Sequence, residues 1–223
     1  MNLAKSFEFF DPSKCTDPVN VIGTGSVGSA ICEHLARYGI TQANLYDFDV
    51  IEDHNLANQM FTAEDVGKPK VEVVAARWLK INPDAEDGVR IFPEGWNGQR
   101  LEGYVFLCVD NIELRKRIVE ENKHNKNIKA MFDCRTSLDT AQTFAADWSN
   151  RDQVVAFYDT MDFTHEEAKQ NTPVSACNVA LCVFSTISAV ANAVVTNFVN
   201  FVKGEGIIQG MIVRPFAHEI LVL

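Results

Sequence analysis

A glycine-rich turn between a short apolar strand and a helix constrains the fold of this chain more than any other feature. Residues 19–23 (VNVIG) form an apolar, β-branched run, and a helical pattern begins at about residue 30. Between them, Gly23, Gly25 and Gly28 have the spacing GxGxxG. In this motif the first glycine permits a tight turn, the second lets a phosphate approach the backbone, and the third allows close helix–strand contact. The motif therefore predicts a nucleotide-binding unit whose helix directs free N–H groups at an anion.

Apolar runs and helical patterns alternate up to about residue 135, and the pattern changes afterwards. Further strands are expected at residues 43–48, 88–92, 104–109 and 128–133, with helices at 70–80 and 111–124. This alternation predicts an α/β fold with a doubly wound, mostly parallel sheet of the Rossmann type. Later runs predict an antiparallel extension, with a hairpin of residues 140–148 and 153–158 and final strands at 207–213 and 218–223. We expect one domain over 1–223, with a nucleotide-binding half, 1–135, and a second half, 136–223.

Charge and cysteine content exclude several classes of protein. The chain has 20 Lys and Arg against 30 Asp and Glu, a net charge of −10, which argues against a nucleic-acid-binding protein because phosphates require a basic surface. None of the six cysteines forms a CxxC pair, so neither a structural zinc site nor a thioredoxin-type site is expected. The first residues contain no continuous apolar segment of a signal peptide. Together with the unpaired cysteines, this predicts a cytoplasmic protein.

One segment is apolar enough to suggest a membrane span. Residues 174–202 contain no charged residue and are long enough to cross a bilayer. Asn178, Asn192, Asn197 and Asn200 lie within it, however, and four amides in hydrocarbon would be costly. We therefore expect a helix buried on most sides, at a subunit interface and outside any membrane. A membrane span is the alternative.

The acid at the end of the second expected strand leaves two nucleotide classes open. Asp47 follows the glycines by about 20 residues, where an acid usually bonds a ribose hydroxyl. An NAD-dependent oxidoreductase fits the glycine turn and Asp47 as well as an ATP-binding enzyme does. A loop or capping carboxylate is the plain structural interpretation of Asp47.

The motifs that follow separate these classes, because their order is similar to that of a known family. The chain contains Asp47-x-Asp49, then Asn55-Leu56 with Gln59, then Gly67 to Lys70, Asn82-Pro83, and Asp110-Asn111 with Arg115. In this order, and after the glycine turn, they resemble the adenylating domain of the ThiF/MoeB/HesA family, which is related to ubiquitin-activating enzymes. The first 135 residues carry most of the resemblance, and the rest matches in outline.

The resemblance implies a function, ligands and roles for particular residues. Such enzymes use ATP and Mg²⁺ to adenylate the C-terminal carboxylate of a small β-grasp protein, either ubiquitin-like or a sulfur carrier. The resemblance places carrier binding and homodimerisation in residues 136–223. It implies that Lys70 contacts the phosphates, Asp110 binds Mg²⁺ and Asp47 binds the ribose, while Asn55 and Gln59 lie beside the triphosphate. The implied nucleotide-binding set is Gly23, Gly25, Ser26, Gly28, Asp47, Asp49, Asn55, Asn58, Gln59, Lys70, Asp110 and Asn111, and the catalytic set is Lys70, Asp110, Asn55 and Cys177.

Structural roles are the alternative for the two most important of these residues. Lys70 is then an exposed lysine in the first turn of a helix. Asp110 is then an ordinary cap where a strand passes into a helix. Neither alternative requires a ligand.

The chain departs from the family pattern at two positions of the nucleotide site. Asn58 stands where the family usually has Arg, so a charged, bidentate phosphate ligand is missing. Either Arg135 or another arginine compensates, or the chain is a degenerate relative that binds nucleotide or carrier protein without adenylating. Ser26 replaces a more usual Gly, and its hydroxyl could reach a phosphate.

The cysteines allow one further interpretation. Cys177 follows the polar segment 159–173, near the place where simpler relatives have a crossover loop and a cysteine. It is either a thioester acceptor or a small buried residue at a helix start. Cys182, which we expect inside the apolar helix, and Cys108 are predicted core residues.

Overall fold

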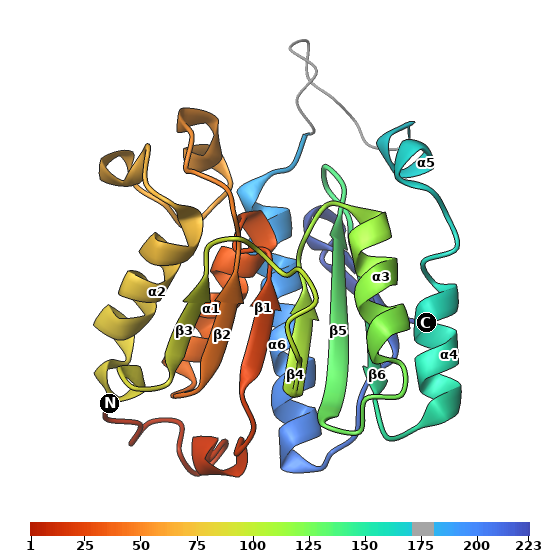
Figure 1. Ribbon diagram of the computed structural model, residues 1–223, viewed down its shortest axis with the longest axis horizontal. Helices are drawn as coiled ribbons and strands as arrows, with labels where there is room; N and C mark the ends of the chain where they lie inside the picture. The colour runs from red at the N-terminus through yellow and green to blue at the C-terminus, as the bar shows by residue number, and fades with distance from the viewer. Residues whose placement is uncertain (171–180) are drawn as a thin grey trace.

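Parallel strands joined by helices form the first part of the sheet, and antiparallel strands extend it (Figure 1). The computed structural model describes residues 1–170 and 181–223, and in these residues the order of the sheet is β3-β2-β1-β4-β5-β6-β7-β8. The parallel strands are β1 (Val19–Ile22), β2 (Ala43–Tyr46), β3 (Val89–Phe92), β4 (Gly103–Leu107) and β5 (Ile128–Thr136). The antiparallel strands are β6 (Ala141–Asp147), β7 (Gly210–Arg214) and β8 (Glu219–Val222). The predicted doubly wound sheet with an antiparallel extension is confirmed.

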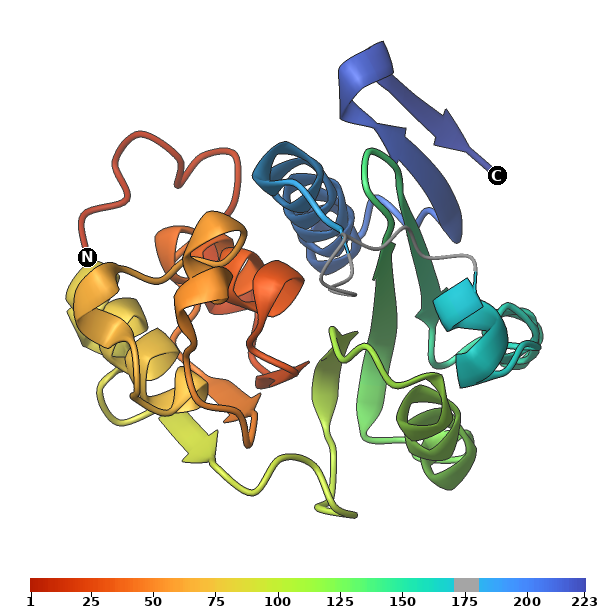
Figure 2. The ribbon, with the colours of Figure 1, turned by 90° about the horizontal axis from the view of Figure 1, so that it is seen from above.

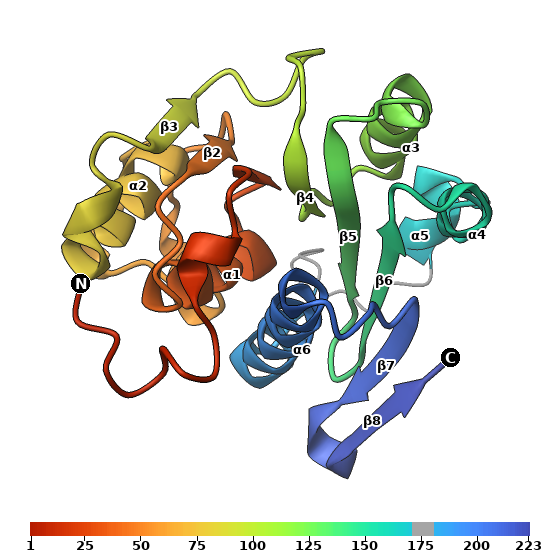
Figure 3. The same cartoon turned by 90° about the horizontal axis from the view of Figure 1, so that it is seen from below.

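Helices cover both faces of this sheet (Figures 2 and 3). The helices are α1 (Ser26–Arg37), α2 (Lys70–Ile81), α3 (Ile112–Asn122), α4 (Arg151–Asp159), α5 (His165–Gln170) and α6 (Phe184–Lys203). Buried side chains of α1, α2 and α6 join one hydrophobic cluster, and those of α3 and α4 join the other. Strand β4 is buried along its whole length, so its alternating side chains contribute to both clusters.

The long apolar segment forms a core helix of this one chain. Helix α6 begins at Phe184, and residues 174–180 of the predicted helix lie outside the described residues. Ten residues of α6 are buried, and Phe198 packs edge-to-face against Phe106 and Phe132 of the central strands. Among the described residues α6 is the one helix long and apolar enough to cross a membrane, and 56% of its apolar window is buried within the protein. The helix is thus largely buried within one chain, and its expected place at a subunit interface stays a prediction.

An asparagine inside α6 shows how the helix accommodates polar side chains. Asn197 is buried, and its side-chain Nδ2 donates to the Ile208 carbonyl at 2.8 Å while its Oδ1 accepts from the Ile208 N–H at 2.9 Å. Both halves of the amide are thereby paired, so its burial carries no large desolvation cost. The contact also fixes the segment that leads into β7.

The predicted hairpin after residue 135 is wrong in its second strand. Residues 153–158 belong to helix α4, and the hairpin is instead formed by β5 and β6. The Asn150 side chain accepts from the N–H groups of Asp152 and Gln153 and thus caps the helix, as asparagine commonly does. Val154 and Phe157 are buried at helical spacing, whereas Val155 is 53% exposed. The capping signal in residues 149–152 (SNRD) therefore outweighs the β-branched composition of residues 153–158.

A buried glutamate joins α1 to α2 on one face of the sheet. Glu33 accepts from Arg37 Nε at 2.8 Å within α1 and from Arg77 Nε at 2.5 Å across to α2. Burial alone would raise the pKa of Glu33, but the hydrogen bonds and charges of Arg77 and Arg37 outweigh burial and hold this pKa below its ordinary value. The ion pairs therefore stabilise the packing of α1 on α2 only while Glu33 is ionised.

We predict that Glu33→Gln lowers the free energy of unfolding at pH 7 by roughly 2 kcal/mol, because hydrogen bonds to a charged group are lost. The pKa of Glu33 is depressed in the folded state, so its contribution is fully present above the unfolded pKa. It is lost as pH falls through the folded pKa, and the gap between variant and wild type should close there. Urea denaturation across pH 7 to 3 measures this gap. Glu72→Gln, at an exposed position of α2, is the control and should show no comparable gap.

Candidate active site

The glycine turn brings the backbones of β1, α1 and β4 into direct contact. Gly23 has φ +92°, and a Cβ there would lie 2.9 Å from backbone atoms of Cys108 and Val109. A Cβ at Gly28 would lie 1.9 Å from the Gly23 carbonyl oxygen. These two glycines are therefore required by the packing of the protein itself.

The middle glycine is different, because the protein leaves the space beside it open. Gly25 is the N-cap of α1, no side chain caps the helix there, and its first turn contains no acidic residue. A Cβ at Gly25 would meet only Gln59 Oε1, at 3.8 Å. Ser26 follows as the first residue of α1 and is half-buried. The first N–H groups of α1 are thus available to an anion, the environment that a nucleotide phosphate requires.

Asp47 fastens the glycine turn from the end of β2. Its Oδ2 accepts from the Thr24 N–H at 2.6 Å and from Thr24 Oγ1 at 3.0 Å, and its Oδ1 accepts from the Asp49 N–H at 2.9 Å. Thr24 is fully buried and was missed by the sequence analysis, although its place inside the glycine motif could have indicated it. Asp47 therefore has a structural role here, and its contact with a ribose stays a prediction.

Lys70 lies at the start of α2 but is not exposed to solvent. Only 7% of the residue is exposed, and Nζ donates to Asp49 Oδ2 at 2.8 Å. The Lys70 N–H also donates to the Asp49 carbonyl at 2.9 Å, which fixes the helix start to the loop after β2. The alternative of an exposed lysine is wrong, and the cation is held at the same edge of the sheet as the glycine turn.

The polar loop between β2 and α2 lies against α1. Asn55, in the short 3-10 helix η2 (Asp53–Ala57), is buried, and its Oδ1 accepts from the Glu52 N–H at 2.9 Å. Half-buried Asn58 ends η2. The Met60 N–H donates to Ser29 Oγ at 3.2 Å and so ties the loop to α1.

Gln59 is the member of this loop that reaches the glycine turn. Its Oε1 is buried, has no hydrogen-bond partner among the described residues, and is the atom nearest to the open side of Gly25. Buried amide groups are normally paired, so an unpaired one beside an open helix N-terminus is the feature expected of a ligand site. The structure thereby brings Gln59 beside the open N-terminus of α1, and its contact with a triphosphate stays a prediction.

The turn after β4, whose backbone lies against Gly23, carries an acid. Asn111 Oδ1 accepts from the Leu114 N–H at 2.9 Å and caps α3, so the capping role considered for Asp110 belongs to Asn111. Asp110 is exposed, and no hydrogen bond or ion pair engages its carboxylate within residues 1–170 and 181–223. Its oxygens are therefore free to bind a ligand from outside the chain.

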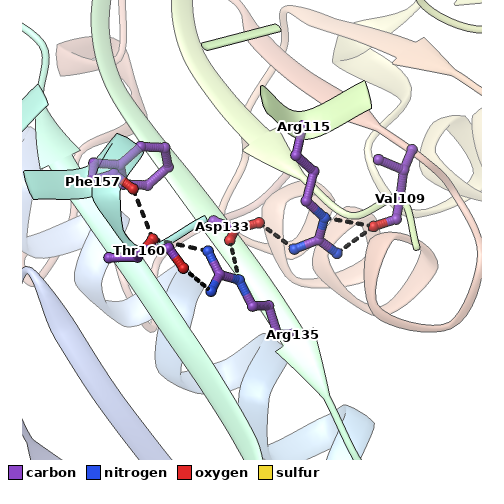
Figure 4. A network of polar contacts seen from close by, with 6 residues as sticks. All are labelled: Val109, Arg115, Asp133, Arg135, Phe157 and Thr160. Carbon is purple, nitrogen blue, oxygen red and sulfur yellow. Dashed lines mark hydrogen bonds and ion pairs between the residues drawn. The ribbon is translucent and has the colours of Figure 1, made fainter. Parts of the chain in front are cut away.

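Two arginines and a buried aspartate form a network behind this turn (Figure 4). Asp133, within β5, is fully buried and accepts from Arg115 Nη1 and, at 2.7 Å, from Arg135 Nε. Arg135 also donates to the Thr160 carbonyl at 2.7 Å and to Thr160 Oγ1 at 2.9 Å. The guanidinium groups are thus engaged with protein acceptors, and the suggestion that Arg135 compensates for Asn58 stays a prediction.

The cysteines of the described residues are all free thiols. Cys182 precedes α6 instead of lying within it, and it is half-buried against the core. Cys108 is also half-buried against the core, next to the glycine turn. Burial raises the pKa of the Cys182 thiol. Cys177 lies outside the described residues, and its thioester role stays a prediction.

The donor set fits a magnesium ion that arrives with a nucleotide. Among the residues that the structure describes, no three His, Cys, Asp or Glu side chains are grouped to hold a metal. Mg²⁺ usually keeps several waters and binds one or two carboxylates together with substrate phosphates. The free carboxylate of Asp110 near an open helix N-terminus matches that requirement.

We predict stability effects of very different size for two glycine substitutions in this turn. Gly28→Ala should lower the free energy of unfolding by about 3 kcal/mol or more, because its Cβ would collide with the Gly23 carbonyl. Gly25→Ala should change it by less than about 1 kcal/mol, because its Cβ makes only an ordinary contact. Chemical denaturation of both variants measures this. Equal losses would contradict the separation of a packing glycine from a ligand glycine.

Comparisons with known proteins bear on the family and the fold of the chain. The model of the ThiF family matches residues 16–218. Ubiquitin-like modifier-activating enzyme 5 of Culex quinquefasciatus is 32% identical over 120 residues, covering 45% of this chain and 29% of that protein. The chain thus spans about a third of the length of the curated relatives it matches. Among solved structures, E. coli MccB with ATP has a TM-score of 0.67 and 18% identity, covering 95% of this chain and 64% of that one. E. coli MccB with SeMet MccA has a TM-score of 0.71 at 18% identity, covering 95% and 65%.

Proposed function

The chain belongs to the ThiF family, and we propose on that premise that it uses ATP and Mg²⁺ to adenylate the C-terminal carboxylate of a small β-grasp protein, ubiquitin-like or sulfur-carrying. One observation carries this proposal: an uncapped helix N-terminus, a buried lysine and an unengaged carboxylate lie at one edge of the sheet. A hydride-transferring NAD enzyme needs neither the lysine nor the carboxylate. The relative from Culex is named for activating a ubiquitin-like modifier, and MccB has been crystallised with ATP.

In the proposed reaction a carboxylate oxygen of the carrier protein attacks the α-phosphorus of ATP. A new carbon–oxygen–phosphorus linkage forms, the bond to the β-phosphate breaks, and pyrophosphate leaves with its electron pair. The N–H groups at the start of α1 hold phosphate oxygens, and Lys70 supplies a fixed positive charge beside them. Gln59 Oε1, which can only accept, would take a donor group of the nucleotide. Asp110 would hold Mg²⁺, which neutralises charge on the phosphate oxygens.

A second candidate function is favoured by a specific observation. Asn58 occupies the position of the usual arginine, and Arg115 and Arg135 are both committed to Asp133. Within the described residues Lys70, held by Asp49, is then the cation that the motif order assigns to the phosphates. A chain with so little positive charge could bind Mg·ATP or the carrier protein without catalysing adenylation. Pyrophosphate exchange separates the two functions, because only adenylation returns radiolabelled pyrophosphate to ATP.

We predict that Mg·ATP binds and that NADH does not. The phosphate site combines Lys70 with a carboxylate suited to Mg²⁺, and this combination has no use in binding a nicotinamide dinucleotide. Isothermal titration calorimetry with each ligand measures the difference. Tighter binding of NADH than of Mg·ATP would exclude the proposed adenylation.

We predict that Lys70→Met reduces the rate of pyrophosphate exchange about 10²-fold or more, because a fixed charge beside the transferred phosphate is lost. Stability should fall by only about 1 kcal/mol, since Asp49 is half exposed and remains hydrated without its partner. Lys80→Met is the matched control, because Lys80 is an exposed lysine in the last turn of the same helix. A fully active Lys70→Met enzyme would show that the phosphate site lies elsewhere.

The proposal includes a homodimer in the cytoplasm, with the contact moved from α6 to the C-terminal hairpin. Strand β8 lies at the edge of the sheet (Figure 3). Its apolar side chains are solvent-exposed. The exposed side chains are Phe216, Ile220, Leu221, Val222 and Leu223. Apolar residues gathered at an unpaired strand edge favour association with another chain. We predict a dimeric mass by light scattering at micromolar concentration, and a monomeric mass would contradict this part of the proposal.

A further inference from the structure

We propose that Asp133 and Arg115 are positioning residues for Asp110: together they fix the turn that presents this carboxylate to a nucleotide-bound metal ion. The inference rests on the proposed function, because it assigns these residues to the same phosphate site.

Arg115 holds the peptide immediately before Asp110. It lies in the first turn of α3, and its side chain reaches back to the end of β4. The Val109 carbonyl accepts from Arg115 Nε at 2.7 Å and also from Nη2, so it is gripped by a fork of two donors. Since Val109 precedes Asp110 directly, this fork fixes the plane of the peptide bond that leads into Asp110.

Asp133 holds Arg115 in turn. Only 6% of Arg115 is exposed, and a buried guanidinium requires a counter-charge. Asp133 supplies it through Oδ1, which accepts from Arg115 Nη1. The register of β4 and β5 pairs Leu107 with Asp133, so the carboxylate lies directly beside the end of the strand that carries Asp110.

Arg135, the second arginine that bonds Asp133, can be compared with Arg115 within the same protein. Its Oδ2 accepts from Arg135, which runs to Thr160 at the end of α4 and lies over the rings of Phe144 and Phe163. Both arginines stabilise the same buried carboxylate, but only Arg115 contacts the turn before Asp110 (Figure 4). A merely structural role predicts similar consequences for losing either arginine. A positioning role predicts an effect on metal binding for Arg115 alone.

The test compares Arg115→Met, Arg115→Lys and Arg135→Met in the full chain. Mn²⁺ replaces Mg²⁺ as a paramagnetic probe, and its binding is followed by EPR in the presence of a non-hydrolysable ATP analogue. We expect Arg115→Met to weaken Mn²⁺ affinity by about 10-fold or more, as losses of residues that orient metal ligands commonly do. Arg115→Lys should restore part of the affinity, because it keeps the charge and one donor but loses the fork.

Arg135→Met is the matched control and should lower the melting temperature while leaving Mn²⁺ affinity within about 2-fold, since Arg135 does not orient a metal ligand. Equal weakening in the Arg115 and Arg135 variants, or none in either, would overturn the positioning role. If Arg115→Met does not fold, Arg115→Lys decides in its place, through a loss of affinity that Arg135→Lys does not share.

A second measurement needs no ligand. Hydrogen exchange at the amides of residues 110–114 should accelerate in both Arg115 variants and stay unchanged in Arg135→Met, and the opposite pattern would contradict the proposal. Failure of the proposed function has a different signature. In that case the wild-type protein itself shows no nucleotide-dependent Mn²⁺ binding, while exchange at the turn still responds to Arg115.

Discussion

The contact between the Gly23 and Gly28 backbones is the constraint on which the rest of the structure depends. Because no side chain separates the two, α1 starts against the end of β1 and crosses directly beside β4. This placement leaves the first N–H groups of α1 at the carboxyl edge of the sheet, between the ends of β2 and β4. A Cβ at position 28 would push α1 away from the sheet and, with it, the surface on which the α2 and α6 side chains pack. The same two glycines therefore determine both the packing of the core and the position of the candidate phosphate site.

Most of the fold could be predicted because its signals are local. Buried parallel strands are short apolar runs, and Asn82-Pro83 ends α2 where proline must end a helix. The errors arose where two local signals competed. Residues 153–158 have strand-like composition, but capping by Asn150 and burial at helical spacing favour a helix. The segment from 174 was extended as one helix because an uncharged run gives no sign of its start, whereas α6 begins at Phe184.

The sequence predicted which residues gather at the candidate site better than it predicted the contacts that these residues make. Motif spacing located Gly25, Gln59, Lys70 and Asp110, because parallel strands carry their terminal residues to one edge. It could not show that Lys70 is buried, since that depends on an ion pair with Asp49, 21 residues earlier. Nor could it show that Asp133 is paired, because its partner Arg115 lies 18 residues away on another element. An aspartate ending an apolar strand is a weak signal by itself. Only tertiary structure shows that the acid is paired.

The charge balance of the site makes the metal ion central to any nucleotide chemistry here. Within the described residues Asp47, Asp49 and Asp110 lie at the carboxyl edge with Lys70, and Lys70 already balances Asp49. A triphosphate brought to this edge would meet the partial positive charge of the α1 N-terminus, which amounts to roughly half an elementary charge. That is far too little to offset the triphosphate and the uncompensated Asp110 together. Asp110 would hold a divalent cation whose charge offsets this repulsion, and the absence of an arginine at position 58 increases the need for it. The orientation of Asp110 then tolerates the least variation of any property of the site. This is a physical reason for fixing its turn, through Arg115, to the fully buried Asp133.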